Sequence, residues 1–82
     1  MYNRNLQKIK PPSRQMIEFL MECHERELMN RLPCEATERG AKGLIDRKLV
    51  RAEYFFDEKG KRFLGVLITT EGRNFLKQIM QL

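Results

Sequence analysis

The stretch from Gly43 to Leu76 constrains the fold most, because its hydrophobic spacing changes twice. Up to Lys48 the apolar residues recur at helical spacing, and from Leu49 they alternate as in a strand. A charged segment with a glycine, a second apolar run and a capped helical pattern follow. The order helix, β-hairpin, helix predicts a small α+β domain with three to four helices and a two-stranded hairpin.

The predicted hairpin has a charged tip from Asp57 to Arg62 and a return strand over 63–68. Gly60 supplies the positive φ that such a tip needs. Residues on the first strand alternate between two faces, as expected when one face is buried. One face would carry Val50, Ala52 and Tyr54, and the other Arg51, Glu53 and Phe55. Phe56 is expected to pair with Phe63 across the strands. Because Phe55 and Phe56 are consecutive, at least one ring faces away from the core, and Phe55 is a candidate partner contact.

A final helix is predicted to begin at Thr69 and Thr70, whose hydroxyl groups suit the capping of free backbone N–H groups. Its apolar face follows helical spacing through Leu76. Apolar residues near this end of the chain are the candidate contacts for a dimer or another partner: Phe75, Ile79, Met80 and Leu82.

Residues 1–12 are predicted to form a basic arm, and residues 13–82 to form the folded domain. The arm carries Arg4, Lys8 and Lys10 and no acidic residue. Two prolines, at positions 11 and 12, cannot continue a helix from upstream, and Ser13 is a suitable N-cap. A first helix from about Ser13 to Glu27 is therefore predicted, with an apolar face at helical spacing.

The segment after this helix allows two interpretations. Residues 26–33 fit either a short second helix or an extension of the first. Pro33 suits the first turn of a new helix, so a further helix is predicted over 35–48. Gly40 and Gly43 each lower the stability of that helix by about 1 kcal/mol relative to alanine. Its inward residues are Ala41, Leu44 and Ile45, and its outward residues are Arg39, Lys42 and Asp46.

Composition limits the classes of function. A net charge of +5, from 16 basic and 11 acidic residues, favours a polyanionic partner. No apolar run approaches the roughly 18–20 residues that cross a bilayer, and no signal-peptide pattern is present, so a cytoplasmic protein without membrane contacts is expected. Cys23, Cys34 and His24 lack the spacing of a zinc site. No catalytic, phosphate-loop or metal pattern is found, so we expect a non-enzymatic protein without cofactor, metal or small-molecule substrate.

Two spacings in the second half resemble those of a known family. They are Leu44-x3-Lys48-Leu49-Val50 and Leu67-Ile68-Thr69-Thr70-Glu71-Gly72-x2-Phe75-Leu76. With the charged hairpin between them, they are similar to the winged-helix DNA-binding domains of bacterial regulators, MarR-like ones especially, over residues 34–80. Lys48 stands where that family usually has glycine, the hairpin lacks the usual Asp-x-Arg, and the long flanking helices of the usual dimer are absent from the pattern.

The resemblance implies a small winged helix-turn-helix domain that binds double-stranded DNA, as a transcriptional regulator or a nucleoprotein accessory factor. Helix 35–48 would present Arg39 and Lys42 to the major groove. The hairpin, as the wing, would place Lys59, Lys61 and Arg62 on phosphates, and the arm would add Arg4, Lys8 and Lys10. Because a monomer of this size would bind weakly, a homodimer is expected.

Other features favour different partners. Glu35 and Glu38 oppose the insertion of helix 35–48 among phosphates, and four further glutamates lie on the first helix. These acids favour a protein-interaction module on the same scaffold, because a fold does not fix a function. The hairpin aromatics with their basic neighbours also fit stacking on single-stranded bases.

Overall fold

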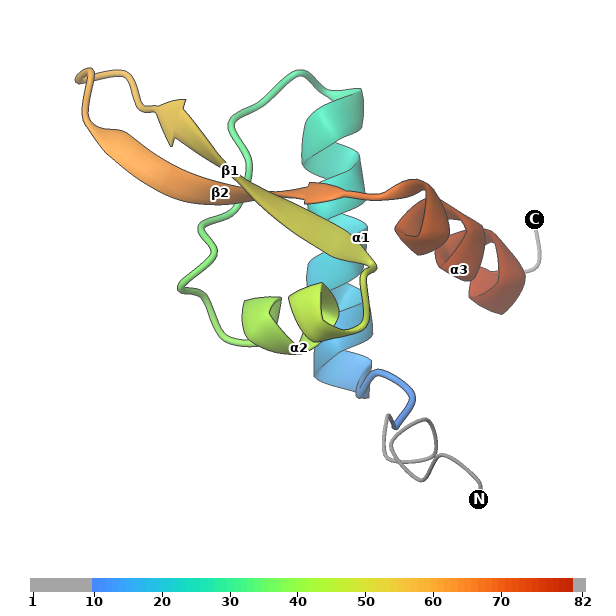
Figure 1. The fold of residues 1–82 in the computed structure, drawn as a ribbon. Coiled ribbons are helices and arrows are strands. Elements are labelled where there is room, and N and C mark those ends of the chain that lie inside the picture. The colour runs from blue at the N-terminus through green and yellow to red at the C-terminus, as the bar shows by residue number, and fades with distance from the viewer. Residues whose placement is uncertain (1–9, 81–82) are drawn as a thin grey trace.

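The computed structural model describes residues 10–80, which form three helices and a two-stranded antiparallel sheet (Figure 1). In chain order the elements are α1 (Arg14–Leu28), α2 (Ala41–Asp46), β1 (Val50–Phe56), β2 (Arg62–Ile68) and α3 (Thr70–Met80). This part of the chain is therefore a small α+β domain, as the hydrophobic spacing predicts. None of these helices is long and apolar enough to cross a membrane. The candidate site residues Arg4, Lys8 and Leu82 lie outside the described residues.

Helix α1 begins and ends close to the predicted positions. The hydroxyl of Ser13 accepts a hydrogen bond from the N–H of Met16 at 3.2 Å, so Ser13 is the N-cap. The helix ends at Leu28, and the chain turns at Asn30, whose φ is 57°. Residues 26–28 are the last turn of α1, and no separate second helix forms over 26–33.

The predicted helix over 35–48 is wrong in its extent, because only the six residues of α2 are helical. The segment 34–36 instead runs beside β2, where Val66 donates to the carbonyl of Cys34 at 3.0 Å and Ala36 donates to that of Leu64 at 2.8 Å. These bonds satisfy backbone groups on the outer edge of β2 and hold the segment extended. Gly40 then adopts a φ of 94°, which a right-handed helix excludes. The chain therefore forms no helix between α1 and α2.

The register of the hairpin pairs Phe55 with Phe63 and Phe56 with Arg62, so the predicted pairing of Phe56 with Phe63 is wrong by one residue. In the set that contains Val50, Ala52 and Tyr54, only Val50 is buried. The hairpin extends well beyond the helices, as Figure 1 shows, so its outer half leaves the core on both strands. The alternation in the sequence therefore identifies the strand, but it does not show which of the strand's residues are buried by the other elements.

The core lies where α1, α2, the inner half of the hairpin and α3 meet (Figure 1). Its fully buried members include Leu20 of α1, Leu44 of α2 and Val66 of β2. Aliphatic side chains dominate this core, and Cys23 and Cys34 fill it as small apolar groups. Each helix and strand contributes at least one residue to this core, and the buried residues of β1 and β2 fix the direction in which the hairpin extends from the helices.

The approach of α3 to the hairpin explains the motif around Thr69. Its hydroxyl accepts a hydrogen bond from the N–H of Gly72 at 3.0 Å and donates one to the carbonyl of Lys48 at 2.8 Å. The predicted threonine cap is thus confirmed for Thr69. A Cβ atom at Gly72 would overlap the carbonyl oxygen of Leu49, so only glycine allows this close approach. Lys48 has a φ of 62°, the left-handed conformation that glycine favours.

Candidate nucleic-acid interface

The hairpin tip is held in one conformation by its own carboxylate. Oδ1 of Asp57 accepts hydrogen bonds from the N–H groups of Lys59 at 2.9 Å and Lys61 at 2.8 Å. The N–H of Gly60 donates to the carbonyl of Asp57 at 2.9 Å, and Gly60 has a φ of 80°, as predicted. With that carboxylate engaged by the backbone, the exposed side chains of Lys59 and Lys61 extend from an ordered turn.

One face of the outer hairpin is aromatic and exposed. Tyr54 and Phe56 are 63% and 65% exposed, and Leu64 lies across from Tyr54 on the same face. The Cζ atom of Arg62 lies 4.5 Å from the centroid of the Tyr54 ring, a cation–π contact. The alternation in the sequence did not identify these exposed rings, since it cannot show where the cover of the core ends.

The opposite face of the hairpin is packed. Phe55 and Phe63 stack with their ring centroids 5.9 Å apart, and both are half-buried. Pro33 and the Phe55 ring cover Gly65, so closely that a Cβ atom there would overlap both. Phe55 was predicted to face away from the core as a partner contact, whereas its ring faces this cluster. The exposed rings of the strand are Tyr54 and Phe56.

The two cations expected to face the major groove from helix 35–48 do not share one helix. Arg39 is exposed in the turn before α2, and Lys42 lies on α2 with its Nζ 3.3 Å from Asp46. Arg47, just after α2, donates from Nε to the carbonyl of Lys10 at 2.8 Å. This contact fixes the first described residue of the predicted arm beside the C-terminal end of α2.

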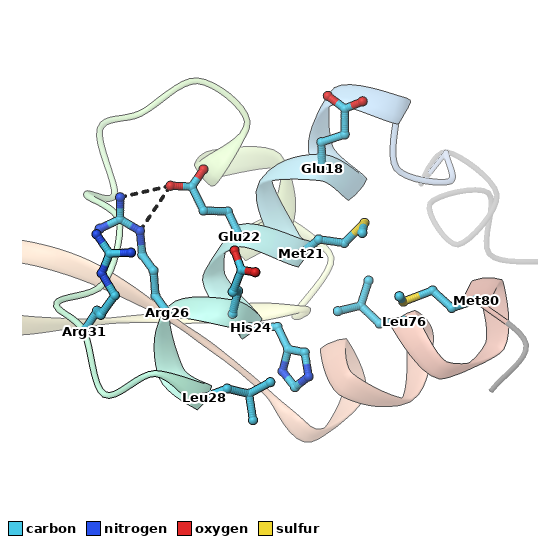
Figure 2. A pocket seen from close by; sticks show the side chains of 10 residues that line it. Glu18, Met21, Glu22, His24, Arg26, Leu28, Arg31, Leu76 and Met80 are labelled. Carbon is cyan, nitrogen blue, oxygen red and sulfur yellow. Dashed lines mark hydrogen bonds and ion pairs between the residues drawn. The ribbon is translucent and has the colours of Figure 1, made fainter.

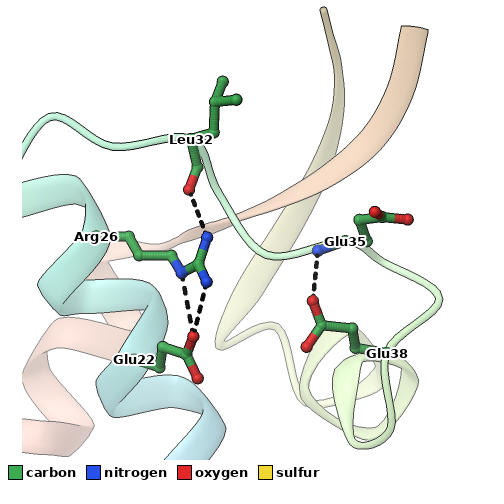
Figure 3. A network of polar contacts seen from close by, with 5 residues as sticks. All are labelled: Glu22, Arg26, Leu32, Glu35 and Glu38. Carbon is green, nitrogen blue, oxygen red and sulfur yellow. Dashed lines mark hydrogen bonds and ion pairs between the residues drawn. The ribbon is translucent and has the colours of Figure 1, made fainter. Parts of the chain in front are cut away.

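Several carboxylates are directed at partners within the domain. Arg26 donates to Glu22 through Nε at 3.1 Å and Nη2 at 2.9 Å, and to the carbonyl of Leu32 at 3.0 Å (Figure 3). The Glu38 carboxylate accepts the N–H of Glu35 at 3.1 Å, also shown in Figure 3. Glu38 thus closes a turn of the chain. The prediction that it lies in the first turns of a helix is wrong. The positions of the Glu22 and Glu38 carboxylates are therefore set by contacts within the domain.

A groove between α1 and α3 forms a second exposed surface. Figure 2 shows Met21 and Leu28 of α1 facing Leu76 and Met80 of α3, with acidic side chains along the α1 side. Two of the predicted partner contacts, Ile79 and Met80, are 42% and 44% exposed on α3. Phe75 packs against the core instead and is half-buried.

The two thiols are buried and chemically quiet. Burial raises the pKa of Cys23 from 9.0 to about 12, with smaller contributions from the neighbouring Cys34 and nearby glutamates. Burial also raises the pKa of Cys34, and both residues are free thiols. Among the described residues, no three His, Cys, Asp or Glu side chains are grouped so as to hold a metal ion.

Comparisons with protein-family models, curated proteins and solved structures found no match for this chain. The structure alone therefore defines its class: a small α+β domain with three helices among the described residues and an antiparallel hairpin. Its exposed features include a basic hairpin tip, an aromatic hairpin face and a groove between α1 and α3 that is lined by apolar and charged side chains. These surfaces are the basis for assigning a function.

Proposed function

We propose that this chain is a non-enzymatic DNA-binding domain of the winged-helix type, with the β1–β2 hairpin as its wing. The observation that carries the proposal is the hairpin tip, where Lys59, Lys61 and Arg62 are exposed. Of the two carboxylates between the end of β1 and these cations, Asp57 is engaged by two N–H groups of the turn, and Glu58 is exposed. A rigid, protruding cluster of cations suits the neutralisation of phosphates.

The α2 side is the secondary part of the proposed interface. Arg39 and Lys42 are exposed there, and Lys48 follows at the turn into β1. Helix α2 has six residues and is therefore about 9 Å long, which limits how much of it can enter a major groove. Phosphate contacts by the tip thus provide most of the proposed affinity, and base contacts by Arg39 or Lys42 provide any sequence preference.

Fluorescence anisotropy on a random duplex, measured across a range of salt concentrations, tests this function. If about five phosphates are neutralised, log K should fall with log salt at a slope of about −4 to −5. A variant with Lys59→Ala, Lys61→Ala and Arg62→Ala should bind weakly. The magnitude of its salt slope should be smaller by about 2.7, since each phosphate contact contributes about 0.9.

The matched control is Lys77→Ala on α3, because α3 lies on the opposite side of α1 from the hairpin tip (Figure 1). It removes an exposed cation and should leave the slope unchanged. A duplex that fails to bind at about 50 mM salt, or a tip variant that binds as the unmodified chain does, contradicts the proposal.

A protein partner, including a second copy of the chain, is the second candidate. The groove between α1 and α3 favours it, because Met21, Leu28 and Met80 are exposed along its sides. Light scattering after gel filtration tests the homodimer directly. Met80→Glu would place a charge in the groove and should convert a dimer into a monomer, whereas Gln78→Glu on an exposed position of the same helix should not. A monomeric unmodified chain at all concentrations contradicts the homodimer.

A further inference from the structure

The outer face of the hairpin carries two aromatic rings that the core does not use. Tyr54 and Phe56 are more than 60% exposed and neither packs against the core, although the guanidinium of Arg62 lies over one face of the Tyr54 ring. Rings left in water contribute little hydrophobic stabilisation, because that contribution scales with the apolar area removed from water. Their side chains therefore point to a role outside folding.

The spacing of the two rings fits an extended strand of nucleic acid. Residues i and i+2 on one face of a strand are about 6.8 Å apart along the chain direction. This is about twice the 3.4 Å rise per nucleotide within a duplex strand. Bases in a duplex are covered by their neighbours, whereas unpaired bases present a face that an aromatic ring can stack on. The pair of rings matches two bases that are not stacked on each other.

Positive charge lies beside both rings. The guanidinium of Arg62 contacts the Tyr54 ring, and Arg31 lines the same hollow as Phe56. Two carboxylates also border this hollow, but Asp57 is held by the turn, which leaves Glu58 as the opposing charge. Aromatic faces combined with cations are complementary to a polyanion that carries unpaired bases.

We propose that Tyr54 and Phe56 stack on unpaired bases of a single-stranded nucleic acid, while Arg62 and Arg31 neutralise the adjacent phosphates. This inference deepens the proposed function and rests on it in so far as both place a nucleic acid on the hairpin. The tip lysines contact phosphates of duplexes and single strands alike. The two rings contact only strands whose bases are unpaired, so they extend the ligand class to melted or single-stranded segments.

The test compares an oligothymidylate of about ten nucleotides with an abasic strand of the same length and charge. Both carry a fluorescein label, and anisotropy gives the two affinities. The unmodified chain should bind the thymidylate at least about five-fold more tightly, the lower limit for stacking one base on a ring. The double variant Tyr54→Val, Phe56→Val keeps strand-favouring side chains and should lose this preference. Because stacking carries no net charge, the preference should persist as added salt weakens both complexes.

Met29→Ala, at the C-cap of α1, is the matched control, because it removes a comparably exposed apolar side chain outside the hairpin and outside the groove between α1 and α3. It should keep the preference, as should Phe56→Tyr, which retains a ring. An unmodified chain with no preference, or a double variant that keeps it, overturns the inference. Duplex binding without any base preference leaves the DNA-binding proposal intact and contradicts this one. A base preference without duplex binding supports the stacking inference and contradicts the duplex-binding proposal.

Discussion

The carboxylate of Glu27, in the last turn of α1, accepts a hydrogen bond from the backbone N–H of Ile68 at 2.7 Å. The two residues are 41 positions apart, so this bond joins the first helix to the end of the hairpin. Arg73 of α3 lies near the other carboxylate oxygen, at 3.9 Å. One glutamate thus links three elements at the point where the hairpin returns to the body.

Glu27→Ala should lower the free energy of unfolding by about 1–3 kcal/mol, because the N–H of Ile68 loses its partner in a partly buried place. Glu27→Gln should recover part of that loss, since an amide oxygen also accepts a hydrogen bond. Urea denaturation measures both. Glu25→Ala, on an exposed position of α1, should change stability by less than about 0.5 kcal/mol. Equal effects of the Glu25 and Glu27 alanine variants would show that the bond is not structural.

Gly72→Ala should destabilise the protein by about 1–3 kcal/mol or more, despite the higher helix propensity of alanine. The added methyl group would overlap the carbonyl oxygen of Leu49, and backbone cannot move aside as a flexible side chain can. Thermal or urea unfolding measures the loss. Gln78→Ala, exposed on the same helix, is the control and should be nearly neutral. A Gly72→Ala protein as stable as the unmodified one would contradict the observed approach of α3.

Lys48→Gly should stabilise the protein by about 0.5–1 kcal/mol, which is unusual for a substitution to glycine. Lys48 has a φ of 62°, where an L-residue is strained by about 1–2 kcal/mol, and glycine loses somewhat more backbone entropy on folding. Asn30→Gly is the matched control, because Asn30 has a φ of 57° and asparagine tolerates that region. Its stability should change little. A Lys48→Gly protein that is less stable would contradict the left-handed turn before β1.

Cys23 should make the stability depend on pH above 9. Its folded pKa of about 12 exceeds the ordinary 9.0, so the native state keeps a proton that the unfolded chain releases. The stabilisation is complete below about pH 9 and is lost progressively as pH rises toward 12. The difference in unfolding free energy between the unmodified chain and Cys23→Ala should therefore shrink between pH 8 and pH 11. A difference that is the same at every pH would contradict this thiol environment.

The hairpin and α3 were predictable from the sequence because each depends on local signals. The alternation of apolar residues, the turn residues and the capping threonine all lie within the segments whose structure they determine. Strands β1 and β2 and the cap at Thr69 therefore follow from their own residues. The start of α1 followed from Ser13 in the same way. For these elements the local preference and the tertiary contacts agree.

The segment between α1 and α2 was not predictable, because its conformation is set by a distant strand. Ala36 and Cys34 bond to β2, about 30 residues further along, and no local pattern reports that an edge of β2 needs partners. The exposure of Tyr54 has a similar origin, since it depends on how far the other elements reach along the hairpin. The tip cations are exposed where the sequence placed them, and their role stays a prediction. Phe55, the ring proposed as an outward contact, is packed, whereas Tyr54 and Phe56 are exposed.

The outer end of the hairpin, from the stacked pair of Phe55 and Phe63 to the tip, has no buried side chain. Changes in its length, charge or aromatic content therefore cost little stability. This end of the molecule therefore tolerates substitutions that the packed core would not. Under the proposed function, ligand preference can thus change by substitution at the tip, without a compensating change in the core.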